Sequence, residues 1–244
     1  MNFHFKQVPA AYRGVVAGLI MGLAGLTLLA VSSLASGRQD AKGGNPAANT
    51  NDAHRAAGNW NFERGNLTGW YTRSRGSGAW YAYADGTKPP NPAETDPDVA
   101  FDVPAPPEGR YAAVTDMAAP GARILYRDVK LNGRVKLQFT IFYDNAGEFS
   151  SPASLDFDGC EANQQFRVEL MDPAAPADST AARHVLATIF KTAPGDPSKL
   201  APRTITFDLS RWAGERVRIR FAQVDSGGPL RAGVDDVRLE RIGS

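Results

Sequence analysis

Apolar and polar residues alternate with a period of two along four segments of the chain, the pattern of a β-strand with one face in a core and one face in water. The four segments are 134–143, 164–170, 203–209 and 216–222. In the last of them, Arg216, Arg218 and Arg220 share the polar face, so the pattern predicts that all three face water. The apolar faces predict a core that includes Phe139, Phe207, Ile219 and Phe221.

Helical periodicity is missing from the sequence after residue 59. The only helical signal there is one short turn, in which Ser210 can cap the start and Gly214 can terminate the end. Further strand candidates are 79–84, 110–116, 122–131, 184–191 and 233–241. About ten strands without a helical layer predict an all-β fold of two antiparallel sheets packed face to face.

Two long segments interrupt the strand pattern. Residues 85–109 contain seven prolines, and residues 144–163 contain the acidic stretch LDFDG at 155–159. Loops of this length in a compact domain are often functional, although disorder is the alternative.

The start of the chain has a different character. Val15–Val31 is a run of seventeen residues without charge, with Lys6 and Arg13 before it and the small residues of Ser33–Ala35 after it. This is the layout of a secretory signal peptide, but the run also approaches the length of a membrane-spanning helix. A cleaved signal and a retained hydrophobic helix that anchors the chain both remain open. In either case we expect the rest of the chain outside the cytoplasmic membrane.

The domain organisation follows from these shifts in composition. Residues 1–35 are the targeting segment or anchor, through which any membrane contact is expected. Residues 36–58 have almost no large apolar side chains, which predicts a flexible tether. Residues 59–244 carry the strand pattern and are predicted to form one β-sandwich domain.

Charge and cysteine content exclude some functions. The chain has 27 basic and 26 acidic residues, whereas a nucleic-acid-binding domain normally has a basic excess, so a nucleic-acid partner is excluded. Cys160 is the only cysteine and cannot form an intrachain disulfide. It could pair with a second chain, but a partly buried, inert thiol is the favoured interpretation.

Several common catalytic motifs are missing from the predicted domain, although a carboxylate pair for glycoside hydrolysis stays open because aspartate and glutamate are plentiful. His184 is its only histidine, at the start of an apolar strand, where a structural role is typical. One histidine and one distant cysteine are too few for a tetrahedral zinc site. The sequence contains no G-x-S-x-G, H-E-x-x-H or phosphate-loop motif. These absences favour a protein that is not an enzyme.

Aromatic residues gather in the first part of the predicted domain: Trp70, Tyr71, Trp80, Tyr81 and Tyr83. Flat rings with polar groups suit the apolar C–H faces of saccharides. In the strand 79–84, alternation places Trp80 opposite Tyr81 and Tyr83, and Trp80 is the better core residue. Trp70, Tyr71, Tyr81 and Tyr83 are therefore the candidate ligand-binding residues. The alternative, that these rings only pack against the sandwich, remains open.

Three parts of the sequence resemble a known family. Residues 59–70 contain NWNFE followed by GNLTGW, which resembles the opening of galactose-binding-like jelly-roll domains, a group that includes many carbohydrate-binding modules and MAM-type adhesion domains. Residues 208–214 and 217–221 resemble the penultimate strand pair of that family, and 234–239 resembles its last strand. The resemblance spans 59–241 and implies a jelly-roll sandwich. It is less specific for the ligand, because this fold hosts several functions.

The resemblance also implies a structural calcium ion, since many such domains hold one between their first and last strands. Carried over to this sequence, the ligands are Glu63 and Asp235, with Asp236 as a third candidate and backbone carbonyls completing the shell. The alternative is that Glu63 and Asp235 are solvated charges at a sheet edge.

Two functional hypotheses follow. The first is a non-catalytic, extracytoplasmic binding module for glycan or another extracellular polymer, either secreted, periplasmic or anchored to the membrane. The second is a structural or adhesion domain that binds a protein partner.

Overall fold

The structure of the protein, a computed structural model, describes residues 58–85, 103–116 and 119–243. The predicted targeting segment and all but the last residue of the predicted tether lie outside these ranges. Within them, no helix has the length and apolar character needed to cross a membrane.

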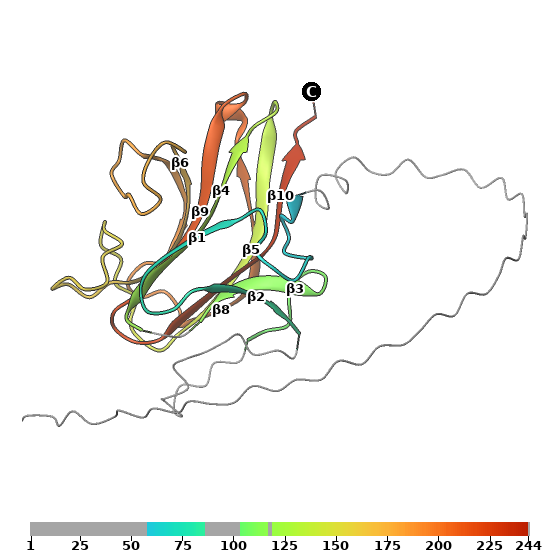
Figure 1. Ribbon diagram of the computed structural model, residues 1–244. Coiled ribbons are helices and arrows are strands. Elements are labelled where there is room, and N and C mark those ends of the chain that lie inside the picture. The colour runs from blue at the N-terminus through green and yellow to red at the C-terminus, as the bar shows by residue number, and fades with distance from the viewer. Residues whose placement is uncertain (1–57, 86–102, 117–118, 244) are drawn as a thin grey trace, which may run out of the picture. The chain divides into compact units, whose positions relative to one another are not determined.

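The described residues form two five-stranded sheets in which every pairing between strands is antiparallel (Figure 1). Sheet A has the order β1 (Tyr71–Gly76), β4 (Gly121–Lys130), β9 (Arg216–Asp225), β6 (Gln164–Met171) and β7 (Val185–Lys191). Sheet B has the order β2 (Trp80–Ala84), β3 (Tyr111–Thr115), β10 (Leu230–Arg241), β5 (Val135–Asn145) and β8 (Lys199–Asp208). The predicted all-β, two-sheet jelly-roll sandwich is confirmed.

The main core lies between the two sheets and contains the predicted residues. Phe139, Ile219 and Phe221 have no exposed surface. Phe207 is half-buried and packs against the same cluster from β8, the edge strand of sheet B. The Phe221 ring meets the Phe139 ring edge to face, with centroids 5.5 Å apart. Truncating a buried phenylalanine of this kind to alanine costs about 3–5 kcal/mol.

The outer face of sheet A is covered, which the sequence pattern did not predict. Two loops lie over it: the β5–β6 loop (146–163) and the β6–β7 loop (172–184). Leu155 of the first loop packs on Ile124 and Val224 in a small apolar cluster separate from the main core. Under the loops, Arg218 is 6% exposed and Arg220 is fully buried. The prediction that these two arginines face water is therefore wrong, and the cause is the loop cover.

The short turn near residue 210 also differs from its prediction. It is a 3-10 helix, Ser210–Trp212, whose N-cap residue is Leu209, and no side chain caps it. The backbone N–H of Ser210 instead donates to Asp208 Oδ1 over 2.7 Å. Gly214 does terminate the turn, with a φ of +89° that a residue with a Cβ rarely adopts.

β1 is a strand that the sequence pattern missed. It is the edge strand of sheet A, and all six of its residues are exposed. Its sequence, YTRSRG, contains no apolar alternation after Tyr71. A strand that buries neither face leaves no periodic apolar signal.

Candidate functional site

The predicted aromatic residues do not form one surface. Tyr71 lies on β1 in sheet A, whereas Tyr81 and Tyr83 lie on β2 in sheet B. Trp70 is buried, with its ring stacked on Phe62 at 5.4 Å and its Nε1–H donated to the carbonyl of Asn59. The burial of Trp70 contradicts its prediction as a ligand-binding residue, because the ring belongs to the main core.

The two tyrosines of β2 differ from each other. Tyr83 is 4% exposed, packs with Phe142 and Val103, and donates its hydroxyl to the carbonyl of Pro104. The prediction that Tyr83 presents its ring to a ligand is wrong, because the segment around residue 104 covers it. Tyr81 is half-buried, and burial followed by the neighbouring Asp116 raises the pKa of its hydroxyl. Trp80, the predicted core residue of this strand, is buried.

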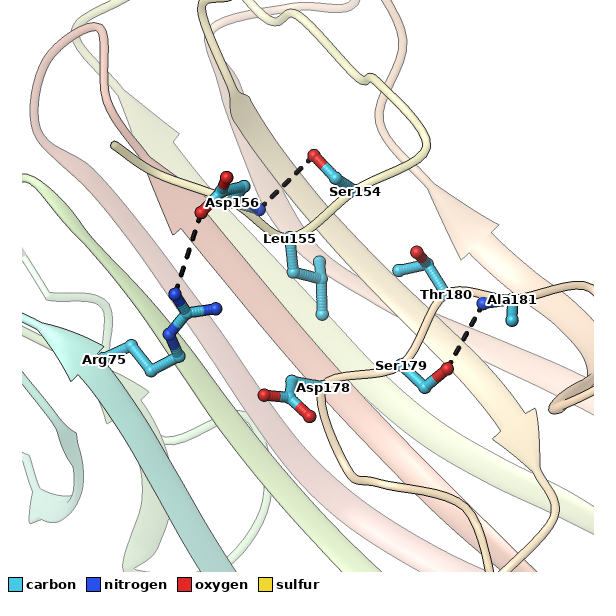
Figure 2. Close-up of a pocket in the computed structure, with 8 residues that line it drawn as sticks. All are labelled: Arg75, Ser154, Leu155, Asp156, Asp178, Ser179, Thr180 and Ala181. Atoms are coloured by element: carbon cyan, nitrogen blue, oxygen red, sulfur yellow. Dashed lines mark hydrogen bonds and ion pairs between the residues drawn. The ribbon is translucent and has the colours of Figure 1, made fainter. Parts of the chain in front are cut away.

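A pocket of about 450 Å³ lies on the outer face of sheet A, at the end of β1. Arg75 of β1 forms one side of it, and the β5–β6 and β6–β7 loops form the others (Figure 2). The residues that line the pocket are Arg75, Ser154, Leu155, Asp156, Asp178, Ser179, Thr180 and Ala181. Guanidinium, carboxylate and hydroxyl groups therefore surround two apolar side chains, Leu155 and the small Ala181.

Ion pairs connect β1 to both loops at this pocket. Arg75 reaches toward Asp156 of the β5–β6 loop, with Nη2 at 3.8 Å from Oδ1, as Figure 2 shows. Arg73 pairs with Asp178 of the β6–β7 loop at 3.0 Å. Asp158 lies close to Asp156 and raises the pKa of its carboxyl through a shared hydrogen bond. All of these groups are at least partly exposed, so the pairs mainly set positions and contribute little stability.

The wall that the β6–β7 loop provides is held from beneath by two buried arginines, a feature we call the arginine clamp. Arg218 donates to the carbonyls of Pro173 and Ala175, at 2.7 and 2.6 Å. Arg220 donates to the carbonyls of Ala177 and Ser179, both at 2.7 Å. The four accepting carbonyls thus belong to every second residue of the segment 173–179.

Carboxylates of sheet A pair with the positive charges of the arginine clamp. Glu169 Oε2 accepts from Arg220, and Asp128 accepts two hydrogen bonds from Arg218 at 2.6 and 3.0 Å. Charged groups that are buried in this way need both a counter-charge and hydrogen-bond partners. The clamp supplies both, and it fixes the backbone of the loop rather than its side chains.

The β5–β6 loop is held in a similar way from β6 and β7. Lys191 Nζ donates to the carbonyls of Ser151 and Pro152, at 2.7 and 3.3 Å. Burial, followed by the charge of Arg167, lowers the pKa of this ammonium group. Gln165 Nε2 donates to the carbonyl of Ser154, which lines the pocket, over 3.0 Å. Both walls of the pocket are therefore fixed to the sheet by buried donors.

Tyr71 is the exposed aromatic residue nearest to this site along β1. The residue is 60% exposed, and its ring stacks on Tyr126 of β4, with centroids 5.3 Å apart and an angle of 23° between the rings. The guanidinium of Arg218 lies 4.5 Å from the centroid of the Tyr126 ring. The arginine clamp therefore supports this pair of rings as well as the loop.

No protein-family model and no curated protein sequence matches the chain. Among solved structures, it is similar to the K1 cleaved adhesin domain of Lys-gingipain from Porphyromonas gingivalis W83, at 13% identity and a TM-score of 0.44, over 75% of this chain and 96% of that one. The K2 cleaved adhesin domain of Lys-gingipain gives 15% identity and a TM-score of 0.44, over 74% and 96% of the two chains. TmCBM61, solved in complex with β-1,4-galactotriose, gives 14% identity and a TM-score of 0.37, over 75% and 96%. Likenesses this distant leave the function to be argued from the residues themselves.

The predicted calcium ligands lie at a different place, around the start of β3. Glu63 is in a turn-rich segment rather than a first strand, and its carboxylate accepts the backbone N–H groups of Arg110 and Tyr111 at 3.0–3.1 Å. Asp235 of β10 is fully buried, and its Oδ2 accepts the N–H of Glu108 over 2.8 Å. Both carboxylates therefore hold the segment that leads into β3.

The side chains as arranged do not form a set of metal ligands. Burial raises the pKa of the Asp235 carboxyl to about 8, although N–H donors lower it. Asp236 accepts from Gln138 at 3.2 Å and pairs with Arg238. In the part of the chain that the structure describes, no group of three histidine, cysteine, aspartate or glutamate side chains is placed to hold a metal ion. Calcium binding stays a prediction.

His184 and Cys160 lie on the two loops of the site. His184 Nε2 is 3.2 Å from Arg183 Nε, which can only donate, so the imidazole proton is assigned to Nδ1, which faces Ser179 Oγ at 2.7 Å. Cys160 is a free, exposed thiol. The favoured interpretation of a partly buried thiol is therefore wrong, because residues 158–162 are all exposed.

Most residues that line the pocket carry no signal in the sequence that singles them out. The length and acidity of 144–163 did indicate a functional loop, and Ser154, Leu155 and Asp156 belong to it. Asp178, Ser179 and Thr180 come from a loop of small residues without a motif. Arg75 lies on the strand that the pattern missed.

Proposed function

We propose that this protein is a non-catalytic binding module for a glycan or another extracellular polymer, and that the pocket on the outer face of sheet A is its binding site. The observation that carries the proposal is the lining of the pocket, where polar groups of several kinds surround the apolar side chains of Leu155 and Ala181. A sugar has hydroxyl groups at its edge and C–H groups on its faces, and this mixture is complementary to both. Ligand sites commonly combine an apolar surface with a few placed polar groups.

Each polar group has a definite hydrogen-bonding capacity toward hydroxyl groups. The carboxylates of Asp156 and Asp178 accept, Arg75 donates, and the hydroxyls of Ser154 and Thr180 can do either. A hydroxyl-rich ligand can therefore satisfy the acceptors and the donors together. Hydrogen bonds to charged groups contribute about 1.5–3 kcal/mol each.

The support beneath the loops also favours a binding function. Ordering a loop when a ligand binds costs free energy, and a site that is already ordered avoids that cost. Here Arg220 holds the carbonyl of Ser179, and Gln165 holds the carbonyl of Ser154, on opposite walls. The pocket is therefore preorganised by contacts that do not involve the ligand.

The one serine–histidine contact at the site supports a non-catalytic role. A serine nucleophile needs an imidazole nitrogen without a proton to accept its hydroxyl proton. The imidazole proton is assigned to the nitrogen of His184 that faces Ser179, because the other nitrogen accepts from Arg183. Ser179 therefore acts as an acceptor and is not activated for attack.

A glycan screen of the purified protein tests the proposal. We expect saturable binding that weakens by about tenfold or more in Thr180→Ala, which removes a hydroxyl, and in Asp156→Asn, which replaces a charged acceptor by a neutral amide. Leu186→Ala is the matched control, because Leu186 is an exposed residue of β7 outside the pocket. Absence of binding to any saccharide, or equal binding by all variants, would contradict the proposal.

The proposed setting is outside the cytoplasmic membrane, supported by the apolar run Val15–Val31 and the positive charges before it. Alkaline phosphatase fused after residue 244 should be active in cells, and an inactive, stable fusion would contradict the export. Mass spectrometry of the N-terminus of the mature protein distinguishes a cleaved signal from a retained anchor.

A further inference from the structure

The outward side chains of β1 form a straight row that begins at the pocket. Tyr71, Arg73 and Arg75 pair with Tyr126, Ile124 and Ala122 of β4. Ile124 and Ala122 belong to the apolar cluster under Leu155, so the row faces the same side as the two loops. Residues two apart on one face of a strand are separated by about 6.8 Å, so Tyr71 and Arg75 are about 14 Å apart.

The pocket is continuous with this row. Arg75 lines the pocket itself, and Asp178, which also lines it, pairs with Arg73, the next residue of the row. Tyr71 follows at the far end and is 60% exposed. The three side chains therefore lead from the pocket to an accessible ring without leaving the outer face of sheet A.

The ring of Tyr71 is held in place for stacking. One of its faces rests on Tyr126, whose ring in turn lies against Arg218. Arg218 is fixed by Asp128 and by two loop carbonyls. The residue remains 60% exposed although one ring face is stacked. A rigid, exposed tyrosine offers contact area at a low cost in conformational entropy.

We propose that Tyr71 is a second subsite, which stacks on a saccharide unit further along a chain that has an earlier unit in the pocket. The ligand is then an oligosaccharide or polysaccharide that runs along β1, rather than a single sugar. This inference rests on the proposed function and deepens it, because it assigns the length of ligand that the site recognises.

Calorimetric titration of the protein with saccharides of increasing length tests the subsite. Suitable probes are neutral xylo-, manno-, cello- and galacto-oligosaccharides of one to six units. For the series that binds, we expect affinity to rise with length until the chain reaches Tyr71. Tyr71→Ala should weaken binding of the longest member about tenfold and leave the shortest binding member within about twofold. Tyr71→Phe, which keeps the aromatic ring, should retain the rise in affinity with saccharide length.

Variants at other positions distinguish a failure of the second subsite from a failure of the proposed function. Leu186→Ala is again the matched control, since it removes an exposed apolar side chain from β7, the edge strand of sheet A opposite β1, and it should bind all lengths like the parent. Affinity that is independent of length, or a Tyr71→Ala variant equal to the parent at every length, would overturn the second subsite while leaving the pocket intact. If no saccharide binds, or if Thr180→Ala changes nothing, the proposed function itself fails, and the subsite fails with it.

Discussion

The outer faces of the two sheets differ in what covers them. On sheet A, buried arginines reach up to the backbone of the β6–β7 loop, Lys191 and Gln165 hold the β5–β6 loop, and the two loops enclose a pocket. On sheet B, the region of β5 and β10 carries a row of charged side chains that pair among themselves and stay partly exposed. In that row Lys136 pairs with Glu240 at 2.9 Å, and Arg238 pairs with Glu240 at 2.6 Å and with Asp236.

The difference shows that the same residue type has a different role on each face. Arg220 and Arg238 both lie on strands and both pair with carboxylates. Arg220 is fully buried and also binds two carbonyls, whereas the side chain of Arg238 is 23% exposed. Burial removes water as an alternative partner, so the contacts of Arg220 determine loop position, and those of Arg238 are replaceable by solvent.

The largest expected effect is from Arg220→Ala. This change leaves Glu169 buried without its main partner and frees two loop carbonyls, so the free energy of unfolding should fall by about 3–5 kcal/mol. Denaturant unfolding followed by tryptophan fluorescence measures the change. If Arg220→Ala unfolds at the same denaturant concentration as the parent, the loop cover is not a structural part of sheet A.

A test of calcium binding extends the comparison to the start of β3, which lies in sheet B like the row of charged side chains on β5 and β10. The calcium hypothesis predicts that metal-free protein gains stability when calcium is added, by about 2.7 kcal/mol at a calcium concentration one hundred times Kd. Differential scanning calorimetry with calcium and with a chelator measures the shift in Tm. Glu63→Gln and Asp235→Asn should remove it. Equal Tm values would show that the N–H donors to Glu63 and Asp235 complete the site without a cation.

The interior between the sheets should respond to pH. Arg123 lies between two buried carboxylates, at 3.2 Å from Asp116 and 2.9 Å from Asp225. Burial raises the pKa of Asp225 to about 6, against the opposing effect of Arg123. Because this pKa is above the value in an unfolded chain, about 3.9, the contribution of Asp225 to stability is present below about pH 4 and is lost as the pH rises through 6.

Urea unfolding of the parent and of Asp225→Asn between pH 4 and pH 8 tests this sign. The free energy of unfolding of the parent should fall relative to that of the variant as the pH rises. Asp144→Asn, which changes a carboxylate paired with the exposed Lys199, is the control and should follow the parent. Parallel profiles for the parent and Asp225→Asn would contradict the raised pKa.

The smallest expected effect is from Arg238→Ala, which tests the exposed face of sheet B. Partly exposed ion pairs contribute about 0–1 kcal/mol, so the variant should unfold within about 1 kcal/mol of the parent. If the free energy of unfolding falls as much as in Arg220→Ala, the ion pairs on the exposed face of sheet B stabilise the fold as strongly as the buried ones under the loops of sheet A.

The sequence was sufficient to predict most of the fold because most strands place their large apolar side chains at every second position, on the face that meets the core. Phe139, Ile219 and Phe221 identify their strands by alternation, and all three are in the core. β1 was missed for the opposite reason, since it buries neither face. The strand that carries Arg75 and Tyr71 was therefore the one least visible in the pattern of apolar residues.

The candidate site was harder to predict because it depends on contacts between distant segments. The pocket joins β1 to loops that begin about 70 and 100 residues later in the chain. Alternation correctly placed Arg218 and Arg220 on the outer face, but it carries no information on what covers that face. Tyr83 shows the same limit, because its burial depends on the segment that contains Pro104.

The arginine clamp binds carbonyl groups, which every amino acid provides. Within 173–179, the buried side chains are the small Ala175 and Ala177, whereas Ala174 and Pro176 point outward. Substitution at the outward positions alters what the wall presents without altering the groups that Arg218 and Arg220 hold. Mutational tolerance is thereby concentrated beside the pocket. The proposed binding site is therefore suited to diversification, in which new side chains arise on an unchanged backbone.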